Sequence, residues 1–292
     1  MSGRPRLAAL LLGAALAGAG TLLSAHELFL RPRGFFVAPG ATITLPVFNG
    51  TFAASENAIA APRITDLSRL GPDGRTAIAR ATWTTRDPRS TVRVAFGGPG
   101  TYVVGVELAA QPITLDGPAF DRYLSEERIT PILDRRRAAK RLGTRARESY
   151  AKAAKALIAV TDASGHLAPA PRDGASAALT PLGYAAEIVP LVDPYTVGVG
   201  GLVPVRALVG GKPLAGWRLR AGGAIGTSTA STPVQELTTD ADGRADVRLT
   251  HDGHWYVAFV HMVEGRPGSG FDYVSRWATI TFGVLPGDAR RR

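Results

Sequence analysis

Two apolar segments near the C-terminus decide the fold. They read His251-Asp252-Gly253-His254-Trp255-Tyr256-Val257-Ala258-Phe259-Val260-His261-Met262 and Tyr273-Val274-Ser275-Arg276-Trp277-Ala278-Thr279-Ile280-Thr281-Phe282. Both are dense in β-branched and aromatic side chains, which suit a pleated, half-buried surface. The residues between them, 264–270, include three glycines and a proline, which favour turns. The pattern predicts a β-hairpin with a long loop.

Short β-type segments also occupy the rest of the chain, in two groups separated by Gly, Pro, Asn and Asp turns. The segments are 27–30, 35–37, 42–48, 76–84, 91–96 and 101–108, and then 184–189, 201–209, 217–220 and 245–249. Strands at this spacing are typical of β-sandwiches. We therefore predict a mainly β protein with two immunoglobulin-like sandwich domains, residues 26–115 and 184–285. A linker loop, 163–183, precedes the second domain, and a basic tail, 286–292, follows it.

The two groups of strands resemble each other. Residues 73–79 resemble 242–248, and residues 100–104 resemble 253–257. The strand after Gly40 corresponds to the strand after Gly201. The offset between the paired segments drifts, as loops of different length would make it do. The pattern indicates an internal repeat.

Residues 116–162, between the two groups, contain few β-branched side chains. Phe120, Tyr123 and Leu124 have the spacing of one helical face. The segment 146–160 is alanine-rich and repeats apolar residues at similar intervals. We predict a helical insertion of two or three helices over this region. Its nine Lys and Arg residues between 135 and 155 predict a solvated helix face, with a docking surface for an acidic partner or lipid headgroups as the alternative.

The N-terminus has the pattern of a secretory signal peptide, residues 1–25. Arg4 and Arg6 precede an apolar run that closes at Ser24-Ala25. Cleavage there predicts a periplasmic protein that begins at His26; a retained membrane anchor is the alternative. No second apolar run reaches spanning length, so we expect no transmembrane segment in the mature chain.

Charge and cysteine content limit the partners and the chemistry. The full chain carries a formal net charge of +10, of which the signal peptide holds two positive charges. A basic protein of this kind could bind nucleic acid, but only Tyr150 interleaves the basic run, so we expect no nucleic-acid partner. The chain contains no cysteine, which excludes disulfides and thiolate metal ligands.

Four stretches resemble the DUF4198 family of secreted bacterial proteins. They are 26–30 (HELFL), 148–157 (ESYAKAAKAL), 211–216 (GKPLAG), and the ending formed by 254–262 with 277–282. The resemblance covers nearly all of the mature chain and implies export and a β-rich fold. Some members are labelled nickel or cobalt uptake components, which implies a membrane uptake system or another envelope protein as the partner. His254 stands where the family pattern leads us to expect Arg, so it is not a ligand candidate.

Histidines are the candidate metal ligands. If His26 is the mature N-terminus, its α-amine and imidazole form a bidentate nitrogen chelate suited to nickel, cobalt or copper. His261 is the candidate third donor. Alternation along the last strand pair places His261 on the face opposite His254, beside bulky apolar side chains. The alternative for His261 is a buried, hydrogen-bonded core histidine.

Motifs of common enzymes are absent from the sequence. It contains no Gly-x-Ser-x-Gly elbow, no His-Glu-x-x-His and no phosphate-binding loop. We therefore expect a binding protein, not an enzyme. One hypothesis is a periplasmic metal-binding accessory to an uptake system. The other is a metal-free adaptor module that binds a protein or a carbohydrate.

Overall fold

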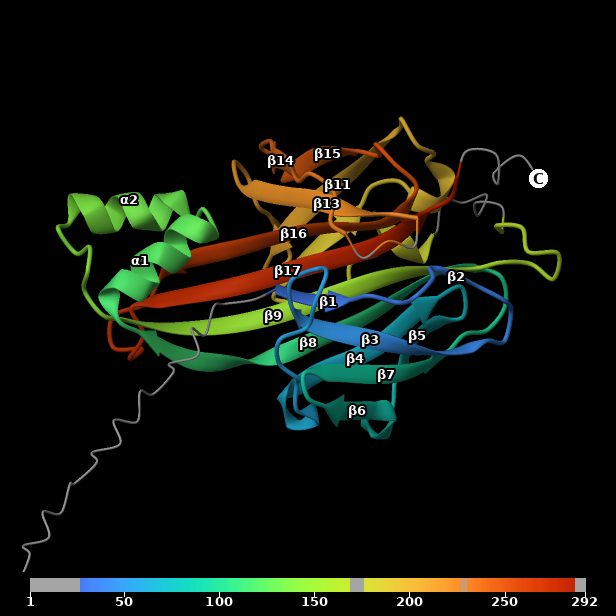
Figure 1. Ribbon diagram of the computed structural model, residues 1–292, viewed down its shortest axis with the longest axis horizontal. Coiled ribbons are helices and arrows are strands. Elements are labelled where there is room, and N and C mark those ends of the chain that lie inside the picture. Colours follow the sequence, from blue (N-terminus) through green and yellow to red (C-terminus); the bar gives the residue numbers. More distant parts are fainter. Residues whose placement is uncertain (1–26, 169–175, 227, 229, 287–292) are drawn as a thin grey trace, which may run out of the picture.

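The computed structural model of the protein describes residues 27–168, 176–226, 228 and 230–286 (Figure 1). The prediction of a mainly β, sandwich-type fold is confirmed, with two short α-helices at one end of the molecule. No helix in the described part of the chain combines the length and the apolar composition that crossing a membrane requires.

The described chain forms strands, two α-helices and short 3-10 turns. The strands are β1 (Glu27–Leu30), β2 (Phe36–Val37), β3 (Thr42–Gly50), β4 (Ile64–Gly71), β5 (Gly74–Ala77), β6 (Trp83–Arg86), β7 (Arg89–Ala95), β8 (Gly100–Leu115), β9 (Ala146–Val160), β10 (Ala186–Pro190), β11 (Leu202–Val209), β12 (Lys212–Pro213), β13 (Arg218–Ile225), β14 (Gln235–Thr238), β15 (Arg244–Arg248), β16 (Gly253–Glu264) and β17 (Tyr273–Val284). The helices are α1 (Gly117–Glu126) and α2 (Thr130–Ala138). Short 3-10 turns are η1 (Ala61–Arg63), η2 (Arg80–Thr82), η3 (Ala177–Leu179) and η4 (Pro194–Thr196).

The strands form one large sheet and two small ones. The large sheet has the order β14-β13-β16-β17-β9-β8-β4-β5, with β2 added beside β9. The first small sheet is β1-β3-β7-β6, and the second joins β10, β12 and β15 to β11. The predicted C-terminal hairpin is confirmed, because β16 pairs with β17 over its whole length.

The strand order is symmetric about the centre of the large sheet. On one side β9 is followed by β8, β4 and β5, and on the other β17 is followed by β16, β13 and β14. The small sheets match in the same way, as β1-β3-β7 and β10-β11-β15. Seven strands of each half correspond and form an immunoglobulin-like arrangement of two sheets, to which β2, β6 and β12 are additions. The halves meet where β9 and β17 pair in parallel, so they share one continuous sheet.

This symmetry supports the predicted repeat and corrects one of its alignments. The strands after Gly40 and Gly201, β3 and β11, occupy matching positions, as do β8 and β16. Residues 73–79 do not match 242–248, because β5 corresponds to β14 and β15 corresponds to β7. A shared turn sequence, Asp-Gly-Arg, produced that misalignment.

The two small sheets pack on opposite faces of the large sheet (Figure 1). On one face, the hydroxyls of Thr279 and Thr281 in β17 donate hydrogen bonds to the carbonyl oxygens of Leu28 and Leu30 in β1. On the other, β10 packs against β17 and β9. We call these the β1 face and the β10 face. The central strands β9 and β17 are therefore covered on both sides.

The prediction that 146–160 is helical is wrong, because this segment is the 15-residue strand β9. The helical insertion shrinks to α1 and α2, which lie in the connection between β8 and β9. Alanine favours helices in isolation, but tertiary packing overrides that preference here. Ala154 and Ala156 face β1, and Ala153 faces β10. Small side chains let both small sheets approach the central strand closely.

The prediction of a solvated basic face is wrong for three of its members. Arg136, Lys152 and Lys155 are at most 4% exposed. Arg136 of α2 donates to Asp121 at 2.8 Å and packs over the Phe120 ring. Each of the two lysines has a polar partner, described below. A partner is expected because burying a charge without one is costly.

The predicted helix beginning near 119 is confirmed as α1. The carboxylate of Asp116 accepts a hydrogen bond from the Ala119 amide at 2.8 Å and caps the helix. Phe120, Tyr123 and Leu124 are buried, as their spacing predicts. They cover the ends of β9, β16 and β17, where Tyr123 stacks on Trp277.

Candidate functional site

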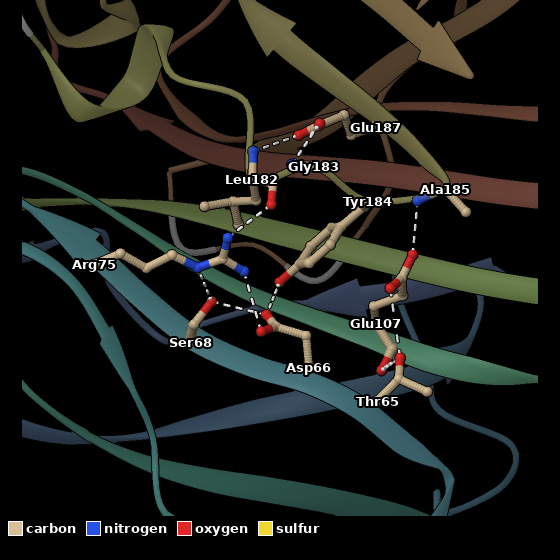
Figure 2. Close-up of polar contacts among 10 residues, drawn as sticks. All are labelled: Thr65, Asp66, Ser68, Arg75, Glu107, Leu182, Gly183, Tyr184, Ala185 and Glu187. Atoms are coloured by element: carbon tan, nitrogen blue, oxygen red, sulfur yellow. Dashed lines mark hydrogen bonds and ion pairs between the residues drawn. The ribbon is translucent and has the colours of Figure 1, made fainter. Parts of the chain in front are cut away.

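Polar side chains concentrate in two places on the large sheet, one on each face. The first, on the β10 face, joins the two halves of the chain (Figure 2). The hydroxyl of Tyr184 donates to Asp66 at 2.6 Å, and Asp66 also pairs with Arg75 at 3.0 Å. Gly105 leaves room for the Tyr184 ring, because a Cβ there would lie 2.3 Å from the Tyr184 hydroxyl oxygen. The amide of Ala185 donates to Glu107 at 2.7 Å.

Glu187 is the most buried member of this first network. Its carboxylate accepts hydrogen bonds from the amides of Leu182 and Gly183, both at 2.9 Å, as Figure 2 shows. Its Oε2 also pairs with the Lys155 ammonium at 2.9 Å, where both side chains are at most 2% exposed. The carboxylate is thus fully supplied with donors from the protein itself. This network is structural.

The second concentration lies on the β1 face, between β1 and the C-terminal end of α1. Its members are Glu27, Glu127, Glu148, Lys152 and Arg220, which we call the acid–base cluster. They come from four elements that are separated in the sequence: β1, the C-terminal end of α1, β9 and β13. Buried titratable groups beside a cavity are candidates for function.

Arg220 of β13 holds two carboxylates of the acid–base cluster. Its Nη2 contacts Oε1 of Glu27 and lies 2.9 Å from Oε2 of Glu127. Burial raises the pKa of Glu127 to about 7, although the charge of Arg220 opposes the rise. Burial also raises the pKa of Glu27, with Arg220 again opposing it. Two carboxylates therefore share one guanidinium group.

Glu148 of β9 is the most enclosed acid of the cluster. Its Oε1 accepts hydrogen bonds from Tyr123 at 3.2 Å and from Ser275, while its buried Oε2 has no hydrogen-bond partner. Burial raises the pKa of the carboxyl group to about 7, against the effects of both hydroxyl donors. A buried carboxylate oxygen without a donor is costly when ionised.

Lys152 of β9 lies on the same face as Glu148. Its ammonium donates to Oδ1 of Asn49 at 2.7 Å and lies 5.4 Å and 5.9 Å from the ring centroids of Tyr150 and Trp277. Burial lowers its pKa to about 7, and nearby Arg63 lowers it further, while the three carboxylates of the cluster raise it. The cluster thus contains two acids and one base that can change charge near neutral pH.

A cavity of about 140 Å³ opens beside the acid–base cluster. It lies between the α1–α2 turn and strands β13 and β16. Glu127 and Arg220 line it together with apolar side chains, among them Ile129, Trp217 and Val260. The cluster is therefore reached from this side through Glu127 and Arg220, while Glu148 and Lys152 lie deeper.

Of the two predicted metal ligands, the described structure places His261. His26 lies outside the described residues. The His261 ring makes an edge contact with Trp217, with 4.8 Å between centroids, and its buried Nδ1 has no hydrogen-bond partner. Burial, aided by Arg276, lowers the pKa of His261. His261 is on the β10 face, as the predicted alternation requires, whereas Arg220 and its partner Glu27 are on the β1 face.

Across the described ranges, no group of three His, Asp or Glu side chains has the arrangement of a metal site. The sequence pattern does not indicate the acid–base cluster, because the composition of 146–160 favours a helix. In a helix, Glu148 and Lys152 form an ordinary exposed pair; in a strand covered on both faces they must be buried.

The symmetric strand order of the two halves defines a duplicated, immunoglobulin-like β-sandwich protein. A model of the DUF4198 family, described as a domain of unknown function, matches residues 23–263. The chain belongs to this family, and the predicted resemblance is confirmed. No curated protein matches the chain.

The solved structures that match show only distant similarity. The D0–D1 domain of intimin has 13% sequence identity and a TM-score of 0.21, with 88% of this chain and 98% of that chain covered. Salmonella alpha-2-macroglobulin reacted with methylamine has 12% identity and a TM-score of 0.22, with 89% and 15% covered. Similarity of this size supports no inference about function, and the fold class rests on the strand order described above.

Proposed function

We propose that this protein is a non-enzymatic binding protein of the bacterial periplasm that captures a divalent transition metal, nickel, cobalt or copper, and serves an uptake system. The observation that carries the proposal is the position of Glu27. Glu27 is the first residue of β1 and follows the candidate chelating histidine in the sequence. It shares Arg220 with Glu127. Carboxylates of this kind are suited to complete a chelate that the amine and imidazole of a terminal histidine begin.

The two carboxyl groups around Arg220 favour the binding of a cation. Glu27 and Glu127 share a single guanidinium, and burial raises the pKa of both carboxyl groups. Near neutral pH the Glu127 carboxyl group can therefore hold a proton that a divalent cation would replace. A terminal histidine supplies two nitrogen donors already fixed on one residue, which lowers the ordering cost of binding. The buried Glu148 and Lys152 are too enclosed to meet a large substrate, which is why we propose binding without catalysis.

The decisive experiment compares metal binding by two forms of the protein. One form begins at His26, and the other carries one additional residue before it. The extension removes the free amine, so we expect calorimetric titration with Ni²⁺, Co²⁺ and Cu²⁺ to show about tenfold weaker binding or worse. Affinity of the first form should fall as pH drops through about 7.7 and 6.5, the usual pKa values of an α-amine and an imidazole.

Two variants locate the remaining donors. Glu127→Gln should weaken binding if its carboxylate contributes, whereas His261→Ala should leave affinity unchanged and lower only stability, because His261 lies on the other face of the sheet. A loss of affinity in His261→Ala would restore it as the third ligand. Equal affinity in the processed and extended forms would contradict the metal proposal and favour the metal-free adaptor function.

Processing is a separate prediction. We expect the intact mass of protein recovered from the periplasm to match a chain that begins at His26, because the apolar run ends at Ala25. A full-length chain in the membrane fraction would contradict both the proposed location and the terminal chelate.

A further inference from the structure

A large cavity beyond the C-terminal end of β1 is lined by several arginines and, among the described residues, by no acid. It has a volume of about 980 Å³ and lies between the β1–β2 connection, the outer side of β3 and the start of β7. Arg31, Arg33, Arg89 and His254 line it, and no Asp or Glu is among its described lining residues. Its volume lies at the upper end of the range for small-molecule sites. The proposed metal function does not use this cavity.

Arg31 is the unusual member of this cavity. Its side chain is 8% exposed, yet no carboxylate forms an ion pair with it within the described part of the chain. It donates to the carbonyl oxygen of Phe52 at 2.6 Å and, more weakly, to that of Ser228 at 3.4 Å. A guanidinium group has five N–H donors, so several remain for another partner. A buried charge normally has a counter-ion, because burial without one is costly.

The surroundings of Arg31 increase the positive charge of the cavity. Arg33 and Arg89 are exposed and line the same space. His254 also lines it, and burial together with the charge of Arg31 lowers the pKa of His254. The guanidinium of Arg31 lies 4.5 Å from the ring centroid of Phe52, a contact that stabilises a cation but does not neutralise it.

The remaining walls are apolar. Phe36, Pro46 and Phe48 line the cavity beside the arginines. Arg31 lies 5.8 Å from the ring centroid of Phe48, so the aromatic and cationic parts of the wall adjoin. A ligand that satisfies both parts needs an oxyanion and an apolar body. The planar fork of arginine matches a carboxylate in a bidentate manner.

We propose that this cavity binds a small amphipathic carboxylate, with the carboxylate on Arg31, Arg33 and Arg89 and the apolar body against Phe36 and Phe48. Glu27, Glu127 and Arg220 do not line this cavity. A chelator can therefore be present in every measurement, so the outcome is independent of the metal proposal.

Calorimetric titration with octanoate, acetate and neutral octyl glucoside tests this proposal. We expect saturable binding of octanoate, weaker binding of acetate, and no binding of octyl glucoside. Octanoate binding should weaken as salt concentration rises. Arg33→Gln and Arg89→Gln should each reduce octanoate affinity by about tenfold or more, since each removes a charge-assisted contact. These residues are exposed, so their replacement should leave the fold intact.

Two further variants complete the design. Arg31→Gln should reduce octanoate affinity most, with thermal unfolding measured alongside because this residue is buried. Arg80→Gln changes an exposed arginine that does not line the cavity, and it should bind octanoate as the wild type does. The proposal is overturned if octanoate does not bind saturably, if octyl glucoside binds equally well, or if Arg33→Gln and Arg89→Gln bind like Arg80→Gln.

Discussion

Lys155→Met should lower the free energy of unfolding by about 3–5 kcal/mol, the usual cost of removing one partner of a buried ion pair. Lys155 and Glu187 are both at most 2% exposed, and their charged atoms are 2.9 Å apart. Without the ammonium, Glu187 keeps only the amides of Leu182 and Gly183 as donors. Urea unfolding at pH 7 measures the loss.

The control for this prediction is an exposed ion pair of the same kind. Arg244 and Asp246 are 3.3 Å apart and close to half exposed. Arg244→Met should therefore cost at most about 1 kcal/mol. The double variant Lys155→Met/Glu187→Gln should regain part of the stability, because no buried negative charge remains. Equal losses in Lys155→Met and Arg244→Met would contradict the structural role of this pair.

Glu148→Gln should gain stability relative to the wild type as pH rises from about 4.5 to 7. In the folded protein the Glu148 carboxyl group keeps its proton until about pH 7, whereas its ordinary pKa is 4.5. Between these values the folded state binds more protons than the unfolded state, so the wild type loses stability as pH rises. The full shift corresponds to a loss on the order of 3 kcal/mol. Glutamine does not titrate and escapes this loss.

Unfolding free energies of both proteins at pH 5, 6, 7 and 8 provide the measurement. The difference in unfolding free energy between Glu148→Gln and the wild type should change mainly below pH 7 and level off above pH 7. Glu126→Gln, an exposed change on the same helix that carries Tyr123, serves as the control. Parallel pH profiles for Glu148→Gln and the wild type would show that Glu148 ionises normally.

Local patterns in the sequence were sufficient for much of the fold. The β16–β17 hairpin and α1 were predicted correctly because their periodicity and turn residues agree with the final structure. The strand β9 was not, because its alanines favour a helix and only its neighbours on both faces make it a strand. Whether residues 146–160 form a helix or a strand depends on residues more than a hundred positions away, which a local pattern does not contain.

The candidate site was less accessible to sequence analysis than the fold. Glu27, Glu148 and Arg220 lie in three different strands, and their proximity follows from the pairing of β9 with β17 and of β16 with β13. The sequence did direct attention to the region around residue 26. It contained no sign that Arg31 lacks an acidic partner, since partners are set by tertiary packing.

The parallel pairing of β9 with β17 also has a consequence for the order of assembly. Its contacts join residues such as Glu148 and Tyr273, 125 positions apart, so they form only after nearly the whole chain has emerged. Until then β9 has an open edge, a hazard for association between incomplete chains. A fragment ending at residue 263, where the family match ends, would lack β17 and leave both β9 and β16 without their shared neighbour. A chaperone that shields this edge of β9 during synthesis or export would have to dissociate before β17 can pair with β9.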